Sequence, residues 1–248
     1  MPRHLVGVRA LRVLALIPVF VFALFFSAPA SVANADATTQ TAMMTLHNQM
    51  RFAIGAPTIP MDPRVAQAAQ NHANYSAANR TGGHFETAGL PYYTGYSARD
   101  RVIAAGLTTS FVSEVATGGS NALAGVSQLW DAPYHRLGLM HPSAMSAGWG
   151  HSDLAGNATV GDITYDFGIR SVDFVRSPAN GQTNIPTSWS GNESPNPLPA
   201  GVSGPVGYPI MVVYSGGQPV DMRAAEVVAP DGTRVPIYYA SQQFERDY

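Results

Sequence analysis

Apolar side chains recur every three or four residues in the first half of the chain, which is the spacing of amphipathic helices. The spacing predicts helices over residues 36–55, 62–79, 97–106 and 121–131. Two of the predicted starts carry helix-capping residues. Asp62 precedes Pro63 at the first, and Ser97 with Asp100 gives the capping-box pattern at the second.

Apolar and polar residues alternate after Met140, which is the period of a half-buried strand. The alternation predicts strands over residues 144–150 and 160–169. Helices followed by antiparallel strands indicate an α+β fold, and we assign residues 36–176 to this domain. Residues 177–208 are rich in Pro, Gly, Ser and Asn and are expected to form a linker. Residues 209–248 are expected to form a small β-rich unit.

The N-terminus has the three parts of a secretory signal peptide, which we assign to residues 1–35. A basic start leads into an apolar run over residues 13–26, and the segment ends in Ala33-Asn34-Ala35, an A-x-A cleavage pattern. A membrane anchor is the alternative, but a helix needs about 20 apolar residues to cross a bilayer. We therefore expect a secreted protein, extracellular or in the cell envelope, with no transmembrane segment after cleavage.

The composition excludes several classes of site. The chain has no cysteine, so disulfide scaffolds, thiolate metal sites and cysteine nucleophiles are excluded. It has 14 basic residues, all Arg, against 16 acidic residues. Removal of residues 1–35 takes away three Arg and leaves a net charge of −5. Such a chain has no broad electrostatic reason to bind nucleic acid or anionic lipid, and we expect a monomer.

Three residues are candidates for chemistry: His84, Glu114 and His135. Two imidazoles and a carboxylate suit zinc or a similar divalent ion, and they could leave one position open for water. Their spacing follows no local rule, so it does not by itself distinguish a site from unrelated surface residues. Glu86 could support His84 as its partner or lie exposed in the same loop.

The other histidines are given structural roles by the sequence. His72 lies on the apolar stripe of the helix predicted over residues 62–79, where a hydrogen-bonded core histidine is expected. His47, His141 and His151 are expected at the surface or in loops.

Short motifs follow one another between residues 46 and 150. They are Leu46-His47-Asn48-Gln49-Met50-Arg51, the run Val65 to Tyr75, Gly83-His84-Phe85-Glu86, Tyr93-Thr94-Gly95, Tyr134-His135-Arg136 and Gly148-Trp149-Gly150. In this order they resemble the CAP superfamily (SCP-like extracellular domains; cysteine-rich secretory, antigen 5 and pathogenesis-related proteins), and most closely its bacterial branch.

The resemblance implies a three-layer α-β-α sandwich with a cleft lined by His and Glu. It implies that His84 is the first cleft histidine, Glu114 the first cleft glutamate, and His135 the histidine that precedes Arg. A second glutamate, which eukaryotic relatives place after the tryptophan matched by Trp130, has no clear counterpart here. The C-terminal unit resembles a β-sandwich module that follows bacterial CAP domains, and it stops before that module's last strands.

Two functions are compatible with these residues. The first is binding of a small apolar, lipid or cell-envelope ligand in a cleft formed by His84, Glu114, His135 and Glu86, with zinc held by His84 and His135 as a candidate cofactor. The second is a metal-dependent hydrolase acting on peptide or envelope polymer, in which Glu114 is a ligand or the general base. The sequence favours binding because it contains no recognisable nucleophile, such as a G-x-S-x-G serine.

Overall fold

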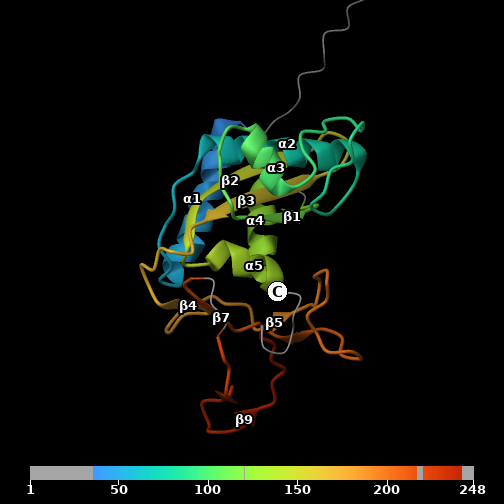
Figure 1. Cartoon of the computed structure of the whole chain (residues 1–248). Helices are drawn as coiled ribbons and strands as arrows, with labels where there is room; N and C mark the ends of the chain where they lie inside the picture. The colour runs from blue at the N-terminus through green and yellow to red at the C-terminus, as the bar shows by residue number, and fades with distance from the viewer. Residues whose placement is uncertain (1–35, 120, 217–219, 242–248) are drawn as a thin grey trace, which may run out of the picture. The chain divides into compact units, whose positions relative to one another are not determined.

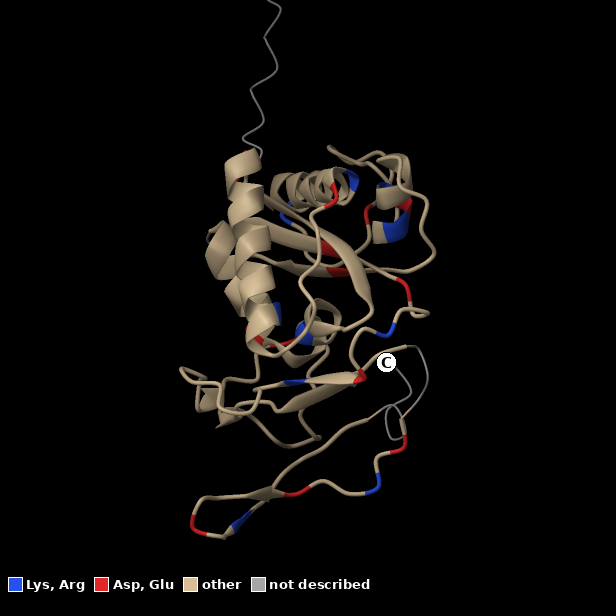
Figure 2. Cartoon of the chain, turned by 90° about the vertical axis from the view of Figure 1, so that its left-hand side faces the viewer, with Lys and Arg blue, Asp and Glu red and all other residues tan. Residues whose placement is uncertain are grey.

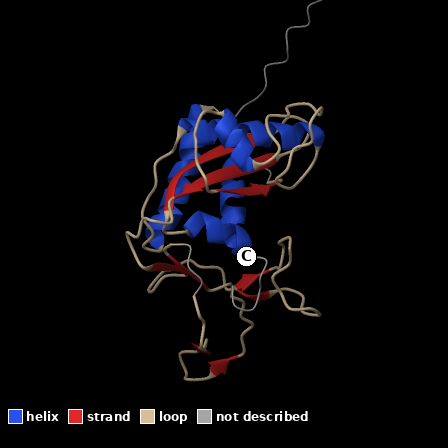
Figure 3. Ribbon diagram, viewed as in Figure 1, coloured by secondary structure: helices blue, strands red, loops and turns tan. Residues whose placement is uncertain are grey.

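Helices cover both faces of a three-stranded antiparallel sheet (Figure 1, Figure 3). The structure is a computed structural model that describes residues 36–119, 121–216 and 220–241. The predicted signal peptide lies outside these ranges. The helices are α1 Ala37–Ala53, α2 Pro63–Asn79, α3 Ala98–Ala104, α4 Ala122–Asp131 and α5 Pro133–Met140. The sheet has the order β1-β3-β2, with β1 Val112–Thr117, β2 Ala144–Ser152 and β3 Ala158–Tyr165. The predicted α-β-α arrangement is confirmed.

Local capping chemistry explains where the helices begin. Asp62 accepts a hydrogen bond from the Arg64 main-chain N–H at the start of α2 (2.8 Å), and Ser97 and Asp100 form the predicted capping box on α3. The fourth helix was predicted to end before Pro133, and α5 was not expected. Pro133 instead occupies the first turn of a new helix, where its missing N–H has no cost.

Glycines in β2 allow helix α2 to pack closely against the sheet. Gly148 and Gly150 of β2 face α2, and a Cβ at Gly148 would lie 2.0 Å from the Ala66 main-chain nitrogen. A Cβ at Gly150 would lie 2.4 Å from the Gln70 main chain. Only glycine permits this close contact between helix and strand backbones.

The other layer contains the main apolar core. Trp149 alternates with the two glycines and is fully buried among residues of α1, α4, α5 and β3, which include Met43, Val126, Leu129, Leu139 and Ile163. His47 lies in this core: it donates from Nε2 to the Leu139 carbonyl (2.9 Å) and accepts from Trp149 Nε1 (3.3 Å). Burial lowers its pKa to about 3, so the ring is neutral. The expectation that His47 lies at the surface was wrong.

The two edges of the sheet differ. The main chain of Ala147 in β2 bonds outward to Pro60 and Asp62 (3.1 and 3.0 Å), which closes that edge. On the other side, the Tyr165 N–H donates to the Phe111 carbonyl (3.2 Å). Because inward and outward bonding alternate in an antiparallel pair, the Glu114 main-chain N–H and C=O then point away from β3. No strand in the described ranges pairs with this edge of β1.

Three short ladders follow the sheet. They are β4 Phe174–Ser177 with β7 Met211–Tyr214, β5 Ser188–Trp189 with β6 Val206–Gly207, and β8 Val227–Val228 with β9 Arg234–Val235. The small β-rich C-terminal region is confirmed, and the segment predicted as a linker contains β5 and β6. None of the described helices has the length and apolarity needed to cross a bilayer.

A buried arginine joins the segment before β7 to the helices. Arg136 of α5 donates to the Asp131 and Pro209 carbonyls (3.0 and 3.1 Å), and its guanidinium lies 4.5 Å from the centre of the Tyr208 ring. The Tyr208 hydroxyl donates to the Asp131 carboxylate (2.7 Å). Tyr208 and Pro209, just before β7, are therefore fixed to the corner between α4 and α5.

Gly148→Ala should destabilise the protein by about 3 kcal/mol, because the added methyl group meets main chain, which cannot move aside as a flexible side chain does. Urea denaturation monitored by tryptophan fluorescence measures this loss. Gly82→Ala is the control, since a Cβ there meets no atom within 4 Å. Equal stabilities of the two variants would contradict the close packing of α2 on β2.

Candidate functional site

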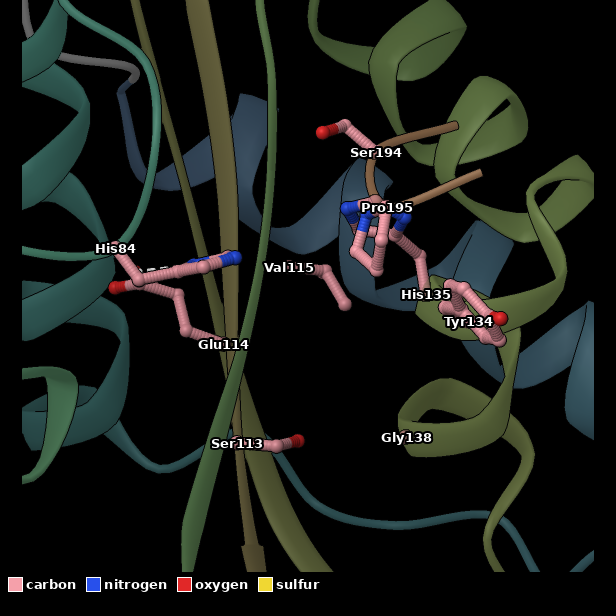
Figure 4. A pocket seen from close by; sticks show the side chains of 9 residues that line it. All are labelled: His84, Ser113, Glu114, Val115, Tyr134, His135, Gly138, Ser194 and Pro195. Carbon is pink, nitrogen blue, oxygen red and sulfur yellow. Dashed lines mark hydrogen bonds and ion pairs between the residues drawn. The ribbon is translucent and has the colours of Figure 1, made fainter. Parts of the chain in front are cut away.

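A pocket of about 180 Å³ lies at the open edge of β1 (Figure 4). Its lining residues come from the loop after α2, from β1, from α5 and from the segment after β5. They are His84, Ser113, Glu114, Val115, Tyr134, His135, Gly138, Ser194 and Pro195. The three residues proposed from the sequence as the centre of a site therefore share one pocket.

His84 forms one wall of the pocket. Helix α2 ends at Asn79 with Arg80 as its C-cap, and Gly83 has a left-handed φ of 93°, which turns the chain back toward the sheet. The His84 side chain is 44% exposed, and its Nδ1 lies 3.0 Å from Glu114 Oε1. An ionised carboxylate only accepts hydrogen bonds, so Nδ1 is the donor. In Figure 4 the ring extends toward the opposite wall.

Glu114 is held in place by a buried arginine. Arg101 Nη2 donates to Glu114 Oε2 (2.5 Å), and neither side chain is more than 2% exposed. Burial alone would raise the pKa of Glu114, but the hydrogen bond with His84 and the charges of His72 and Arg101 together lower it below the ordinary value. Glu114 is therefore an ionised carboxylate that can orient His84.

Arg101 also fixes the loop that carries His84. The same Nη2 donates to the His84 carbonyl (3.1 Å), and Nη1 donates to the Gly95 and Tyr96 carbonyls (3.2 and 3.3 Å). The capping box of α3 begins the helix that supplies this guanidinium. Arg101 was not among the site residues predicted from the sequence, although it lies one position after the capping residue Asp100.

Glu86 lies behind the pocket and does not line it. Its carboxylate accepts hydrogen bonds from the Thr94 and Gly95 main-chain N–H groups (2.6 and 3.3 Å) and from His72 Nδ1 (3.0 Å). These contacts draw the side chain into the interior, where the residue is 1% exposed. Glu86 therefore braces the loop from inside and does not bond to His84 in the way considered from the sequence.

His72 is the hydrogen-bonded core histidine that its position on α2 predicted. Its Nδ1 faces Glu86, while its Nε2 lies 3.0 Å from the Gly83 carbonyl and 3.5 Å from Glu114 Oε1. His72 therefore links the two buried glutamates to the main chain of the loop after α2.

A third acid, Asp162, lies next to Glu114 across the β1–β3 ladder, and Figure 2 shows acidic positions in red on the strands of the sheet. Its side chain is fully buried, and neither oxygen has a hydrogen-bond partner among the described residues. Burial raises the pKa of Asp162 well above its ordinary value, and the negative charge of Glu114 raises it further. We infer that Asp162 is the neutral acid of the pair and Glu114 the charged one.

The opposite wall is formed by His135 at the start of α5. Its Nδ1 lies 2.7 Å from Glu193 Oε1, and the Glu193 side chain is completely buried. The Glu193 carboxylate also accepts the main-chain N–H groups of Tyr134 and His135 (both 3.0 Å). Glu193 was not proposed from the sequence, because it lies 58 positions from His135 in a segment expected to be a linker.

The two walls repeat one arrangement. Each histidine presents Nδ1 to a buried carboxylate, and neither Nε2 has a hydrogen bond to a described residue. Glu114 adds main-chain groups between them: its side chain is 2% exposed while the whole residue is partly exposed, so the exposed atoms belong to the main chain. The pocket therefore offers two imidazole nitrogens, one N–H and one carbonyl to a ligand.

These residues do not fit a zinc site. Structural and catalytic zinc sites use at least three protein ligands, and no group of three His, Cys, Asp or Glu within the described ranges is arranged to hold a metal. Both oxygens of Glu114 are engaged, by His84 and by Arg101. Only the Nε2 atoms of His84 and His135 remain as possible metal ligands, which is fewer than a zinc site uses.

Comparison with known proteins agrees with the motif order. The model of the CAP family, described as the cysteine-rich secretory protein family, matches residues 44–163. This chain contains a CAP domain. The match spans α2, α3, β1, α4, α5 and β2, and it ends within β3, before Glu193. A search of curated proteins found no match.

Solved structures similar to this chain include three bacterial proteins. An extracellular protein with an SCP domain from Bacillus anthracis is 18% identical, with a TM-score of 0.46, over 52% of this chain and 41% of its own. An outer surface protein from Borrelia burgdorferi is 14% identical, with a TM-score of 0.46, over 54% and 98%. A cysteine-rich secretory protein from Staphylococcus aureus is 12% identical, with a TM-score of 0.39, over 52% and 39%. This chain thus spans less than half of the Bacillus and Staphylococcus proteins.

Glu114→Gln should lower the free energy of unfolding by about 3 to 5 kcal/mol, because it removes the nearer of the two carboxylates that lie beside the buried Arg101. Urea denaturation at pH 7 measures the change. Glu226→Gln is the matched control, since Glu226 pairs with Arg234 at the surface, where ion pairs contribute little. If the two variants lost the same stability, Arg101 would not depend on Glu114.

Proposed function

We propose that this protein is an exported CAP-domain binding protein whose pocket takes the polar head of a cell-envelope ligand. The observation that carries the proposal is the pair of histidines held by buried carboxylates on opposite walls. Fixed Nδ1–H groups leave both Nε2 atoms as hydrogen-bond acceptors for a ligand. The Glu114 main chain adds a donor and an acceptor at the open strand edge.

The size and lining of the pocket limit what enters it. Pockets for drug-sized ligands measure roughly 300 to 1,000 Å³, and this one measures about 180 Å³. Histidine, serine and tyrosine line it together with Val115 and Pro195. A group with hydroxyl and amide functions and one apolar face suits this lining better than an entirely apolar molecule. Such a group occurs both in envelope glycans and in glycolipid head groups.

The proposal that the protein is exported rests on the N-terminal sequence and on the match to the CAP family. Residues 1–35 have the order of a signal peptide, and the matching family is described as secretory. We place the mature protein outside the cytoplasm, where envelope ligands are available.

The metal-dependent hydrolase considered from the sequence has less support. It would need a third ligand beside His84 and His135, and the Glu114 carboxylate is already committed to Arg101. The groups that line the pocket instead favour binding of a ligand through hydrogen bonds.

His84→Ala and His135→Ala should each weaken ligand binding at least tenfold, which corresponds to about 1.4 kcal/mol for a lost hydrogen-bonding group. Titration calorimetry of the mature chain with soluble N-acetylated sugar oligomers tests one source of the ligand. Binding to vesicles that carry a glycolipid with the same sugar tests the other. His151→Ala is the control, since His151 lies on β2 and does not line the pocket.

Binding of neither probe by the wild-type chain would contradict the proposal. Binding that His84→Ala and His135→Ala leave unchanged would contradict it equally. A melting temperature that falls on chelation, and recovers with zinc, would favour the hydrolase instead.

A further inference from the structure

The pocket depends on a residue outside the region matched by the CAP family. Glu193 lies beyond residue 163, between β5 and β6, yet its carboxylate is buried against the first turn of α5. We propose that Glu193 is a positioning residue of the binding site: it holds His135 with Nδ1 as the donor and Nε2 available to the ligand. The effect on ligand binding that we expect from this role rests on the proposed function.

Helix α5 supplies no cap of its own. Ala132 stands at the capping position without a side-chain hydrogen bond, and Pro133 follows it. Glu193 takes over this role from a distant part of the chain by accepting the Tyr134 and His135 main-chain N–H groups. A carboxylate is well suited to the N-terminus of a helix, where the free N–H groups carry partial positive charge.

The capping contacts determine the geometry of the imidazole. Glu193 Oε2 bonds to the Tyr134 N–H, and Oε1 bonds to both the main chain and the ring of His135. Two consecutive main-chain groups thus fix both oxygens of the carboxylate. Because Oε1 also faces Nδ1, the ring has one favoured orientation and one favoured tautomer.

The segment that carries Glu193 is itself anchored. Trp189 of β5 is buried and pairs with Val206 of β6. Gly204 passes so close to Ser190 that a Cβ would lie 2.2 Å from the Ser190 carbonyl oxygen. The next residues after Glu193, Ser194 and Pro195, line the pocket. One short segment therefore both orients His135 and forms part of the wall.

The test determines which ring nitrogen of His135 carries the proton. It is read from ¹⁵N chemical shifts by two-bond ¹H–¹⁵N correlation at a pH where the imidazoles are neutral. In the wild-type mature chain we expect the proton on Nδ1. In Glu193→Met, whose thioether is only a weak hydrogen-bond acceptor, we expect the proton to move to Nε2, while His84 keeps its Nδ1–H form. Glu226→Met is the matched control at an exposed position and should change neither ring.

The binding readout uses the same soluble sugar oligomers, and Glu193→Met should bind them at least tenfold more weakly than Glu226→Met. A proton on Nε2 of His135 in the wild-type chain would overturn the inference without any variant, so a folding failure of Glu193→Met leaves the test intact. An unchanged His135 ring in folded Glu193→Met would overturn it too. If the ring changes as expected but the wild-type chain binds no sugar probe, the positioning role stands and the proposed function fails.

Discussion

The site depends on the neutralisation of buried acids by Arg101. Glu114 and Glu86 are both removed from water, and burial of an unpaired carboxylate would cost several kcal/mol. Arg101 lies 2.5 Å from Glu114 and 3.7 Å from Glu86, and it also holds the carbonyl of His84. The charge that permits the acids to be buried thus also fixes the loop that carries the exposed imidazole.

The open edge of β1 gives this buried cluster access to solvent. The closed edge at β2 pairs with residues 60–62, whereas β1 leaves the Glu114 main chain unpaired within the described chain. Alternate residues of β1 point to different layers, so Glu114 reaches His84 while Ser113 and Val115 face α5. The pocket lies where both layers meet this edge, and it draws one imidazole from each side.

Local patterns predicted much of the fold, and distant contacts account for what was missed. Asp62 and Ser97 mark helix starts by chemistry confined to a few neighbouring residues, so the sequence sufficed there. His47 was placed at the surface because no local pattern reveals its contact with Trp149. Glu193 was not predicted as a site residue for the same reason, because no sequence signal in a Pro-rich segment indicates that a carboxylate contacts α5. The motif order identified His84, Glu114 and His135, but the structure was needed to find their partners.

The most direct test of the buried charge arrangement is a site-resolved ¹³C NMR titration of the carboxyl groups of Glu114 and Asp162. The account predicts that Glu114 titrates below the ordinary glutamate range, because of His84 and Arg101, and that Asp162 still carries its proton at neutral pH. An Asp162 that is ionised at neutral pH, or a Glu114 that is protonated there, would contradict it.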